Sequence, residues 1–227
     1  ISTSLDDSSH SLTALVIDKG ENTSALSIAK AVTIDTVAPT ISTVAIASAT
    51  GAVSNTLNAG DVVTATVTLS EAVAVTGSPQ LALKIGEATV QGAYDSTNST
   101  STVLKFNYTV QAGQTDANGI SIAANSLGLN SGTILDLAGN AATITHSLVA
   151  DNSSYAVDTT APTLAITSSA SSPKAGETAT ITFTFSEDPG STFTNSDITL
   201  SGGTLSAIAG DGLTRTATFT PTANTAA

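Results

Sequence analysis

The chain has 227 residues, of which 41% are hydrophobic and 4% aromatic, and it contains no cysteine. Its formal net charge of −12, from 18 acidic and 6 basic residues, argues against nucleic acid and anionic membranes as partners, because both are bound through clusters of Lys and Arg. The lack of cysteine excludes disulfides and thiolate metal sites, so an extracellular chain of this kind needs another means of stabilisation, for which a bound metal is a candidate.

No stretch of the sequence approaches the ~18 apolar residues of a membrane-spanning helix, and the first residues do not have the pattern of a signal peptide. We therefore expect no membrane insertion in this segment. We also expect both ends to be cut from a longer polypeptide.

Alternation of apolar and hydroxyl-bearing residues is the dominant pattern, and it is typical of strands with one buried face. Clusters of Gly, Asn, Asp and Ser separate the alternating segments, as turns require. No amphipathic helix is predicted, and many short strands at regular spacing predict an all-β chain of β-sandwiches with Greek-key connections. In chain order the predicted strands are residues 12–17, 26–34, 41–47, 63–69, 80–85, 89–94, 102–110, 120–123, 179–185, 197–200 and 215–220.

Two nearly identical junctions, residues 32–41 and 155–164, divide the chain. In each, a predicted strand ends in Asp, a four-residue bend ends in Pro, and a new strand begins; Asp35 and Asp158 are 123 residues apart. Repetition of this kind predicts a tandem array of modules stacked end to end. We expect the last strands of one module at residues 1–35, a complete module at 36–158 and the first strands of another at 159–227.

Shorter motifs recur in the same order and align the modules. An Ala-Gly-acidic triplet precedes a predicted strand that ends in Ser-Glu, with acidic residues at positions 61 and 71 and again at 177 and 187. A turn with Asp, Gly and Asn at residues 136–140 precedes the second junction, and residues 18–22 are its counterpart before the first, with the Gly shifted by one position.

In this order the motifs resemble the bacterial immunoglobulin-like repeats that form the extender regions of giant RTX or type I-secreted surface adhesins. The resemblance covers essentially the whole chain. It implies immunoglobulin-like sandwiches, calcium (Ca²⁺) bound at or near module junctions, and a role in attachment to hosts and biofilms. It also implies secretion to the extracellular face of the bacterial cell surface.

The positions of the acidic residues can also be argued from strand geometry. Asp61 and Glu71 flank one predicted strand and have the same parity as its core face. At ~3.3 Å per residue they are roughly 33 Å apart, so they mark opposite poles of the sandwich and cannot share an ion. Glu177 and Glu187 repeat this arrangement.

Topology then predicts which acidic residues meet. The strand after the first junction runs away from it, and the antiparallel return strand ends at Glu71, back at the junction. The turn that begins at Asp136 lies at the same pole, because the last strand must run away again. We therefore expect Asp35, Glu71, Asp136 and Asn140 to converge, and three carboxylates with an amide oxygen suit Ca²⁺.

Four further residues are candidate calcium ligands. Asp158 and Glu187 repeat the pattern at the second junction, and Asp18 and Asp61 belong to the recurring motifs. The alternative is that these acidic residues only shape turns, as Asp commonly does in bends of this composition. The sequence leaves both interpretations open.

Other acidic residues and the two histidines have no such pattern. Residues 116–119 resemble the start of an EF-hand loop but lack its remaining ligands, so a plain turn is predicted. Asp6 and Asp7 are predicted to form a solvated turn. No catalytic role is predicted for His10 or His146, since neither has a nucleophile or metal-ligand pattern beside it.

The preferred hypothesis is a non-enzymatic extender segment whose partners are the neighbouring modules of the same chain, with host or biofilm ligands bound through other domains. One alternative is a module that binds glycan or protein, for which residues 111–134 are the one insertion of sufficient length. Another is a subunit of a filament or surface layer, in which residues 1–35 of one copy complete residues 163–227 of the next by head-to-tail strand addition.

Overall fold

The computed structural model describes residues 5–223, and apart from two short 3₁₀ turns its regular elements there are β-strands. No helix in this range is long and apolar enough to cross a membrane. The chain forms two compact units, Ile1–Thr159 and Thr160–Ala227. The all-β sandwich class is confirmed, whereas the predicted module boundaries stay a prediction; residues 1–4 and 224–227 of the two outer segments lie outside the described residues.

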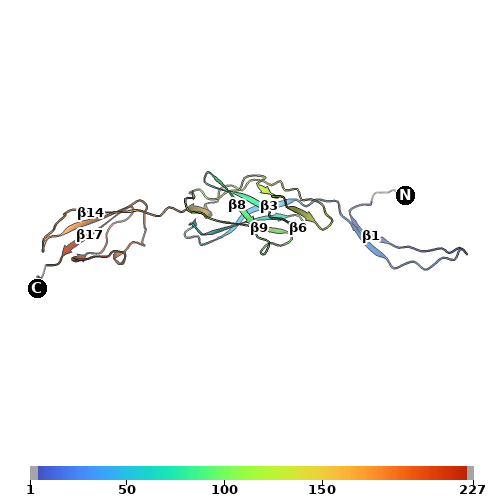
Figure 1. Cartoon of the computed structure of the whole chain (residues 1–227), viewed down its shortest axis with the longest axis horizontal. Coiled ribbons are helices and arrows are strands. Elements are labelled where there is room, and N and C mark those ends of the chain that lie inside the picture. The colour runs from blue at the N-terminus through green and yellow to red at the C-terminus, as the bar shows by residue number, and fades with distance from the viewer. Residues whose placement is uncertain (1–4, 224–227) are drawn as a thin grey trace. The chain divides into compact units, whose positions relative to one another are not determined.

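A long hairpin begins the first unit (Figure 1). Its strands β1 (Ser8–Leu12) and β2 (Lys30–Ile34) pair antiparallel. The predicted strand at 12–17 is wrong beyond Leu12, because each residue pair there keeps only one of its two backbone bonds, donated by the amides of Ser27 and Ser24. The amides of Ala14 and Val16 bond the hydroxyls of Ser27 and Ser24 instead, at 2.9 and 3.0 Å.

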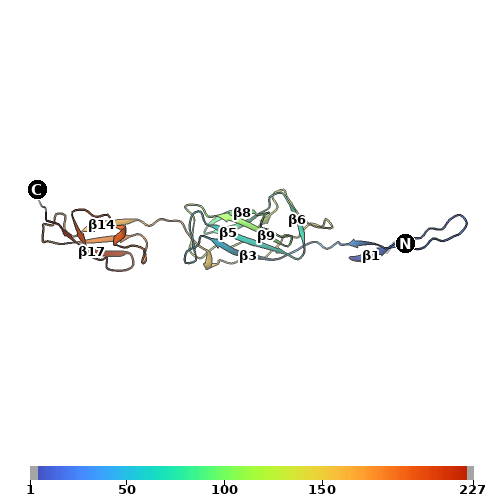
Figure 2. The ribbon, with the colours of Figure 1, turned by 90° about the horizontal axis from the view of Figure 1, so that it is seen from below.

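A six-stranded sheet in the order β11-β7-β8-β9-β5-β3 forms the main layer of the first unit (Figures 1 and 2). Two smaller sheets, β12-β6 and β10-β13-β4, complete it, and the 3₁₀ turn η1 spans Ser153–Tyr155. The strands are β3 (Ile41–Thr50), β4 (Thr56–Leu57), β5 (Val62–Leu69), β6 (Val73–Thr76), β7 (Gln80–Ile85), β8 (Ala88–Tyr94), β9 (Val103–Thr109), β10 (Thr115–Asp116), β11 (Leu127–Gly128), β12 (Thr133–Asp136) and β13 (Ala156–Asp158).

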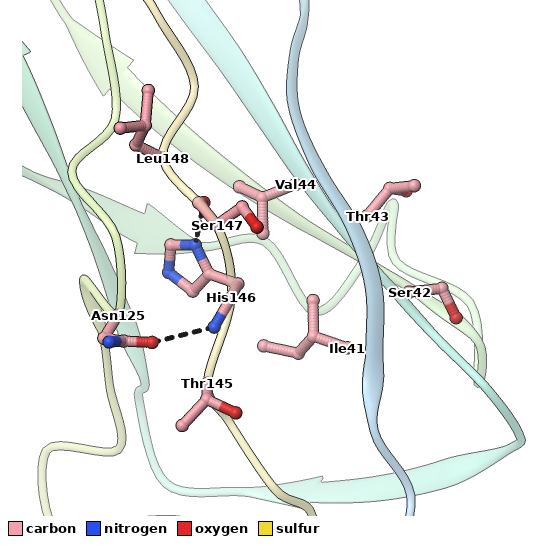
Figure 3. Close-up of a pocket in the computed structure, with 9 residues that line it drawn as sticks. All are labelled: Ile41, Ser42, Thr43, Val44, Asn125, Thr145, His146, Ser147 and Leu148. Carbon is pink, nitrogen blue, oxygen red and sulfur yellow. Dashed lines mark hydrogen bonds between the residues drawn. The ribbon is translucent and has the colours of Figure 1, made fainter.

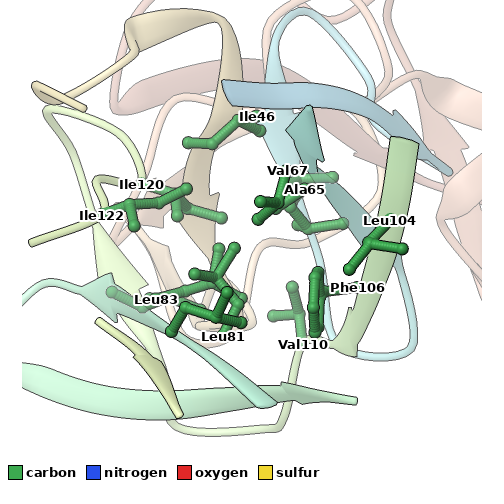
Figure 4. Close-up of a cluster of buried hydrophobic side chains, with 14 of the residues drawn as sticks. Ile46, Ala65, Val67, Leu81, Leu83, Leu104, Phe106, Val110, Ile120 and Ile122 are labelled. Atoms are coloured by element: carbon green, nitrogen blue, oxygen red, sulfur yellow. The ribbon is translucent and has the colours of Figure 1, made fainter. Parts of the chain in front are cut away.

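Alternation along the strands produces the core of this unit. Every second residue of β5 is buried, from Val63 to Leu69, while the threonines between them are half-buried on the outer face. Strands β7 and β9 supply Leu83 and Phe106, which are fully buried in the same cluster (Figure 4). The outer faces of the strands are thus polar through their hydroxyl groups, and they cover the apolar interior without needing many charged residues.

Residues 120–158 cross the same core with little continuous strand. The predicted strand at 120–123 forms only isolated bridges, Ser121 with Lys84 and Ile122 with Val149. Its apolar side chains are nevertheless buried, because Ile120 and Ile122 belong to the core cluster.

The second unit is a four-stranded antiparallel sheet in the order β14-β15-β17-β16 (Figure 1). Its core is Phe183, Phe185 and Ala217, and the ring of Phe193 packs edge-on against both phenylalanines at centroid distances of 5.2 and 4.8 Å. The strands are β14 (Leu164–Ser168), β15 (Ala179–Phe185), β16 (Gly203–Leu205) and β17 (Thr214–Pro221).

The predicted strand at 197–200 is wrong. Asp197 instead closes the 3₁₀ turn η2 (Asn195–Asp197) by accepting a hydrogen bond from the Thr194 amide at 2.8 Å. Reciprocal capping of this kind satisfies the free amides at the start of a helical turn, and it competes with a strand conformation.

Truncation of the core leucine Leu83, which is 1% exposed, tests this description of the first unit. We expect Leu83→Ala to lower its free energy of unfolding by about 2–5 kcal/mol, because it leaves a cavity. All three tyrosines lie in the first unit, so tyrosine fluorescence during urea unfolding reports on that unit alone. The control is Val53→Ala, at a position 74% exposed, which should change the stability by less than about 0.5 kcal/mol. Equal effects of the two variants would contradict the assigned core.

Candidate metal centre

Three carboxylates from distant parts of the first unit meet at one pole of the sandwich. Asp35 lies in the linker after β2, Glu71 follows β5, and Asp136 ends β12. Each offers one oxygen, and these oxygens lie within 4.8 Å of one another. Within residues 5–223 no other group of three His, Cys, Asp or Glu side chains has this spacing.

Pairing of β3 with β5 brings the linker to Glu71. The two strands run antiparallel, with Ile41 opposite Leu69. Just before this pair, the Thr40 amide donates to the Ser70 hydroxyl at 2.9 Å, and the Ser70 amide donates to the Thr40 carbonyl at 2.8 Å. The residue after Ser70 is therefore held close to the linker.

Asp136 is buried and begins a tight turn. Its Oδ1 accepts the amides of Ala138, Gly139 and Asn140 at 2.7–2.8 Å. Gly139 has φ of +98°, a conformation that favours glycine. Since Oδ2 accepts a single hydrogen bond, from the Asn140 side chain at 2.8 Å, this oxygen keeps a lone pair for a cation.

Asn140 connects the turn to the linker. Its Nδ2 also donates to the backbone carbonyls of Asp35 at 3.1 Å and Val37 at 3.4 Å. The structure therefore uses the amide nitrogen of Asn140 as a donor that joins linker and turn. The predicted use of its amide oxygen as a metal ligand stays a prediction.

Asp7 holds the linker from the hairpin side, which the sequence did not reveal. Its carboxylate accepts the Thr36 amide at 3.2 Å and the Thr36 hydroxyl at 2.9 and 3.0 Å. The prediction of a solvated turn is therefore wrong for Asp7, because its side chain contacts the linker instead. Nothing in the local Asp-Asp-Ser-Ser sequence distinguishes it from a turn residue.

The three carboxylates repel one another. Burial raises the pKa of Glu71, and the nearby charges of Asp35 and Asp136 raise it further. Burial is the largest single influence on the pKa of Asp136, and it raises that pKa. The hydrogen bonds from Asn140, Gly139 and Ala138 together outweigh burial, so the pKa of Asp136 is lowered overall. The arrangement concentrates negative charge at one pole.

The spacing of these oxygens fits a calcium ion. Ca²⁺ binds oxygen at about 2.3–2.6 Å, so two ligands on opposite sides of the ion are about 5 Å apart. The three oxygens lie within 4.8 Å of one another, inside that limit. Carboxylate oxygens are hard ligands of the kind that calcium prefers, and carbonyls and water complete its shell in such sites.

Asp18 repeats the Asp136 turn in the hairpin. Its Oδ1 accepts the amides of Gly20 and Asn22 at 2.8 and 2.9 Å, and its Oδ2 accepts the Asn22 side chain at 2.9 Å. The Asn22 side chain is the main cause of the lowered pKa of Asp18. This turn is exposed, and among the described residues Asp18 belongs to no group of three acidic or other metal-ligating side chains, so its metal role stays a prediction.

Asp95 shows that such a turn also occurs without a metal-site geometry. Its carboxylate accepts the Asn98 amide and side chain at 3.0 and 2.8 Å, and the Asn107 side chain at 2.9 Å. These bonds, that of the Asn98 side chain above all, lower the pKa of Asp95. The Asp-Asn turn alone is therefore a structural device.

Asp61 lies away from the three carboxylates, as its predicted position at the other pole requires. Its Oδ2 accepts the Asn58 amide at 2.7 Å, and in the second unit Glu177 accepts the Lys174 amide in the same way at 2.9 Å. The recurrence of an acidic residue after Ala-Gly thus has a structural cause, the closure of a turn. This supports the turn interpretation of Asp61.

Asp158 and Glu187, the candidates of the second junction, belong to different units. Asp158 ends β13 in the first unit, and Glu187 follows β15 in the second. Their predicted meeting stays a prediction.

Asp116 is buried and closes a turn. Its two oxygens accept the amides of Gly86 at 2.7 Å and Gly119 at 3.0 Å. This geometry matches the predicted plain turn rather than an EF-hand loop.

His146 lines a pocket beside β3, and its ring is held by the backbone (Figure 3). Nε2 accepts the Ser126 amide at 2.9 Å, so Nδ1 carries the proton and donates to the Ser147 carbonyl at 2.8 Å. Both ring nitrogens are occupied, which supports a structural role for this histidine.

Comparison with known families bears on the second unit. The family described as bacterial Ig-like domain matches residues 158–227. No curated protein and no solved structure is similar enough to the chain to count as a match. This match covers less than a third of the chain, so it is a likeness of the C-terminal part to bacterial Ig-like domains.

Titration of Glu71 tests the charge crowding. In the metal-free chain we expect its pKa to lie above 4.5, so its contribution to stability is present below that value and is lost as pH rises through the folded pKa. Asp35→Asn removes one repelling charge and should lower the pKa of Glu71, although burial should keep it raised. Carbon-13 NMR of the side-chain carboxyls measures this. Asp95→Asn, in a turn outside the cluster, is the control and should leave the Glu71 titration unchanged.

Proposed function

We propose that the chain is an extender segment of a bacterial surface protein, and that calcium bound by Asp35, Glu71 and Asp136 stiffens its first junction. The observation that carries this proposal is the origin of the three carboxylates. One comes from the linker itself and the other two from the module that follows it. A single cation at this place would tie the linker to the module.

Two states of the junction follow from these contacts. Without a cation the linker is held by neutral and singly charged hydrogen bonds, through Asn140 and Asp7, against the repulsion of the carboxylates. With a cation that repulsion becomes attraction, and Asp35 gains two fixed partners. The bacterial Ig-like match supports a structural, surface-exposed role in which such stiffness is useful.

Export gives calcium dependence a physical rationale. The bacterial cytosol is poor in free calcium and the surroundings of the cell are richer in it, so a chain of this kind would be pliable before secretion and stiff after it. The chain has no cysteine and therefore forms no disulfides. A bound metal ion is the remaining kind of cross-link that can hold distant parts of this acidic chain together.

Calcium should stabilise the first unit selectively. A ligand that binds only the folded state at roughly one hundred times its Kd adds about 2.7 kcal/mol of stability. We expect the melting temperature reported by tyrosine fluorescence to rise with Ca²⁺ and much less with Mg²⁺, whose octahedral shell needs shorter bonds.

Glu71→Gln separates binding from repulsion in the same measurement. It should abolish the response to calcium, and in EDTA it should leave the melting temperature unchanged or raise it, because one repelling charge is gone. The matched control is Glu87→Gln, an exposed position with the same charge change, which should respond as the unaltered chain does. If calcium does not change the melting temperature of the unaltered chain, the proposal is wrong.

Stiffening itself can be measured with spin labels, since the chain has no cysteine of its own. Labels at Ser9→Cys in β1 and Thr89→Cys in β8 report on either side of the linker. We expect a narrow distribution of label–label distances in calcium and a broad one in EDTA. With Glu71→Gln added, calcium should no longer narrow the distribution; equal widths with and without calcium would show that the ion does not restrain the junction.

A further inference from the structure

The last arm of the first unit, residues 141–149, is held in place by few hydrogen bonds. It contains no regular strand, and an isolated bridge fixes it near each end, at Thr143 and at Val149. Between these two bridges, every hydrogen bond that ties the arm to another segment within residues 5–223 involves His146. The polar attachment of this stretch therefore depends on one residue.

His146 attaches the arm to its two neighbours, Asn125 and Ser126, through three contacts. Its backbone amide donates to Asn125 Oδ1 at 2.9 Å (Figure 3), and its carbonyl accepts the Asn125 amide at 3.2 Å. The third contact uses the ring, because the Ser126 amide donates to Nε2 at 2.9 Å. Ser126 leads into β11 and accepts the Ala82 amide of β7 at 3.1 Å, so the ring links the arm to the edge of the six-stranded sheet.

Only the neutral ring of His146 fits these partners. A backbone amide can only donate, so Nε2 offers its lone pair to Ser126. A carbonyl can only accept, so Nδ1 carries the hydrogen that it directs to Ser147. A second proton would enter at Nε2 and face the Ser126 N–H, which turns a hydrogen bond into a contact between two donors. The Ser126 hydroxyl, 3.5 Å from Nε2, is too distant to replace that bond.

No charge on the surrounding segments favours a protonated ring. The pocket around His146 is lined by no other titratable side chain. Strand β3, residues 120–130 and the rest of the arm carry no Asp, Glu, Lys or Arg. Lys84 of β7, which is bridged to Ser121, has the same sign as a protonated imidazole. A proton on His146 therefore costs a hydrogen bond and gains no ion pair.

More distant charges have a weaker effect. The nearest acidic residues along the chain are Asp136, which accepts the amides of its own turn, and Asp151, which accepts the Asn118 side chain. The net charge of −12 favours protonation of any histidine, but salt screens such interactions beyond about 8 Å at physiological ionic strength. The local contacts of the ring therefore decide its behaviour.

We propose that His146 is a proton-sensitive clasp: its neutral ring holds the arm on Ser126, and protonation in mildly acidic surroundings releases it. Histidine is suited to this role because it ordinarily titrates near pH 6.5. His10 provides the contrast. Its Nε2 lies 2.8 Å from the Asp6 carbonyl, to which it can only donate, so a second proton leaves that bond intact.

Proton linkage gives the direction and the size of the effect. With the clasp open, the ring takes up a proton as pH falls through about 6.5, whereas the closed clasp excludes that proton. The contact is therefore at full strength above this range and weakens as pH falls below it. For a ring that stays neutral while closed, the ratio of open to closed forms rises about thirtyfold by about pH 5.

The tautomers of the two histidines are the first test. We expect nitrogen-15 NMR of the unaltered chain at about pH 7.5, in EDTA, to show the hydrogen of His146 on Nδ1 and that of His10 on Nε2. His10→Gln removes one set of signals and so assigns both. EDTA keeps the result independent of calcium binding. A hydrogen on Nε2 of His146 would overturn the proposal.

Hydrogen exchange measures the release itself. Between about pH 7.5 and about pH 5 we expect the protection of the Ser126 amide, corrected for the intrinsic exchange rate, to fall by up to about thirtyfold. The amide of Val67, which is fully buried in β5, is the control and should lose much less protection. Equal changes at the two amides, or no change at Ser126, would contradict a local clasp.

His146→Gln supplies an acceptor oxygen that does not titrate in this range. We expect urea unfolding followed by tyrosine fluorescence to depend less on pH in this variant than in the unaltered chain. His10→Gln makes the same replacement at the other histidine and should keep the original pH dependence. Carboxylates such as Glu71 are common to all three proteins, so their titration cancels. An unchanged pH dependence in His146→Gln would overturn the proposal, and if this variant fails to fold, the two measurements on the unaltered chain still decide it.

Discussion

The reciprocal hydrogen bonds between Thr40 and Ser70 are the contact on which the rest of the junction depends. They hold the first residues after the linker against the end of β5, and in an antiparallel two-layer fold the end of β12 arrives at the same pole. Crowding of Asp35, Glu71 and Asp136 is therefore a consequence of topology. Burial raises the pKa of Glu71, and the charges of Asp35 and Asp136 raise it further; in the proposed function a divalent cation relieves this repulsion.

The Asp136 turn shows how a buried carboxylate can remain ionised beside like charges. Three backbone amides converge on one of its oxygens, and these bonds together with the Asn140 side chain outweigh the effect of burial on its pKa. The same asparagine holds the linker carbonyl of Asp35. In the proposed function, calcium would thus reinforce a contact that hydrogen bonds have already aligned, and this alignment reduces the ordering that binding requires.

Local pairing and burial are separable in this chain. The N-terminal hairpin and the sheet of the second unit both form their backbone ladders, yet Val16 and Ile166 remain exposed. A β-layer can satisfy its hydrogen bonds alone, but it can bury its apolar face only against a second layer.

The sequence by itself determined the fold class, the strands with unbroken alternation and the carboxylates that topology brings together. Strands β7 and β15 have the predicted bounds, and β5 starts one residue early, because side-chain parity decides which face is buried. Where serine or aspartate side chains bond nearby backbone groups, the alternation of apolar and polar residues no longer predicts a strand, as at residues 12–17 and 197–200. Only the tertiary structure decided that Asp7 binds Thr36, that Asn140 turns its nitrogen to the linker, and that Asp61 closes a turn. The same residue types serve all these roles, and the partner that comes within hydrogen-bond distance depends on how remote segments pack.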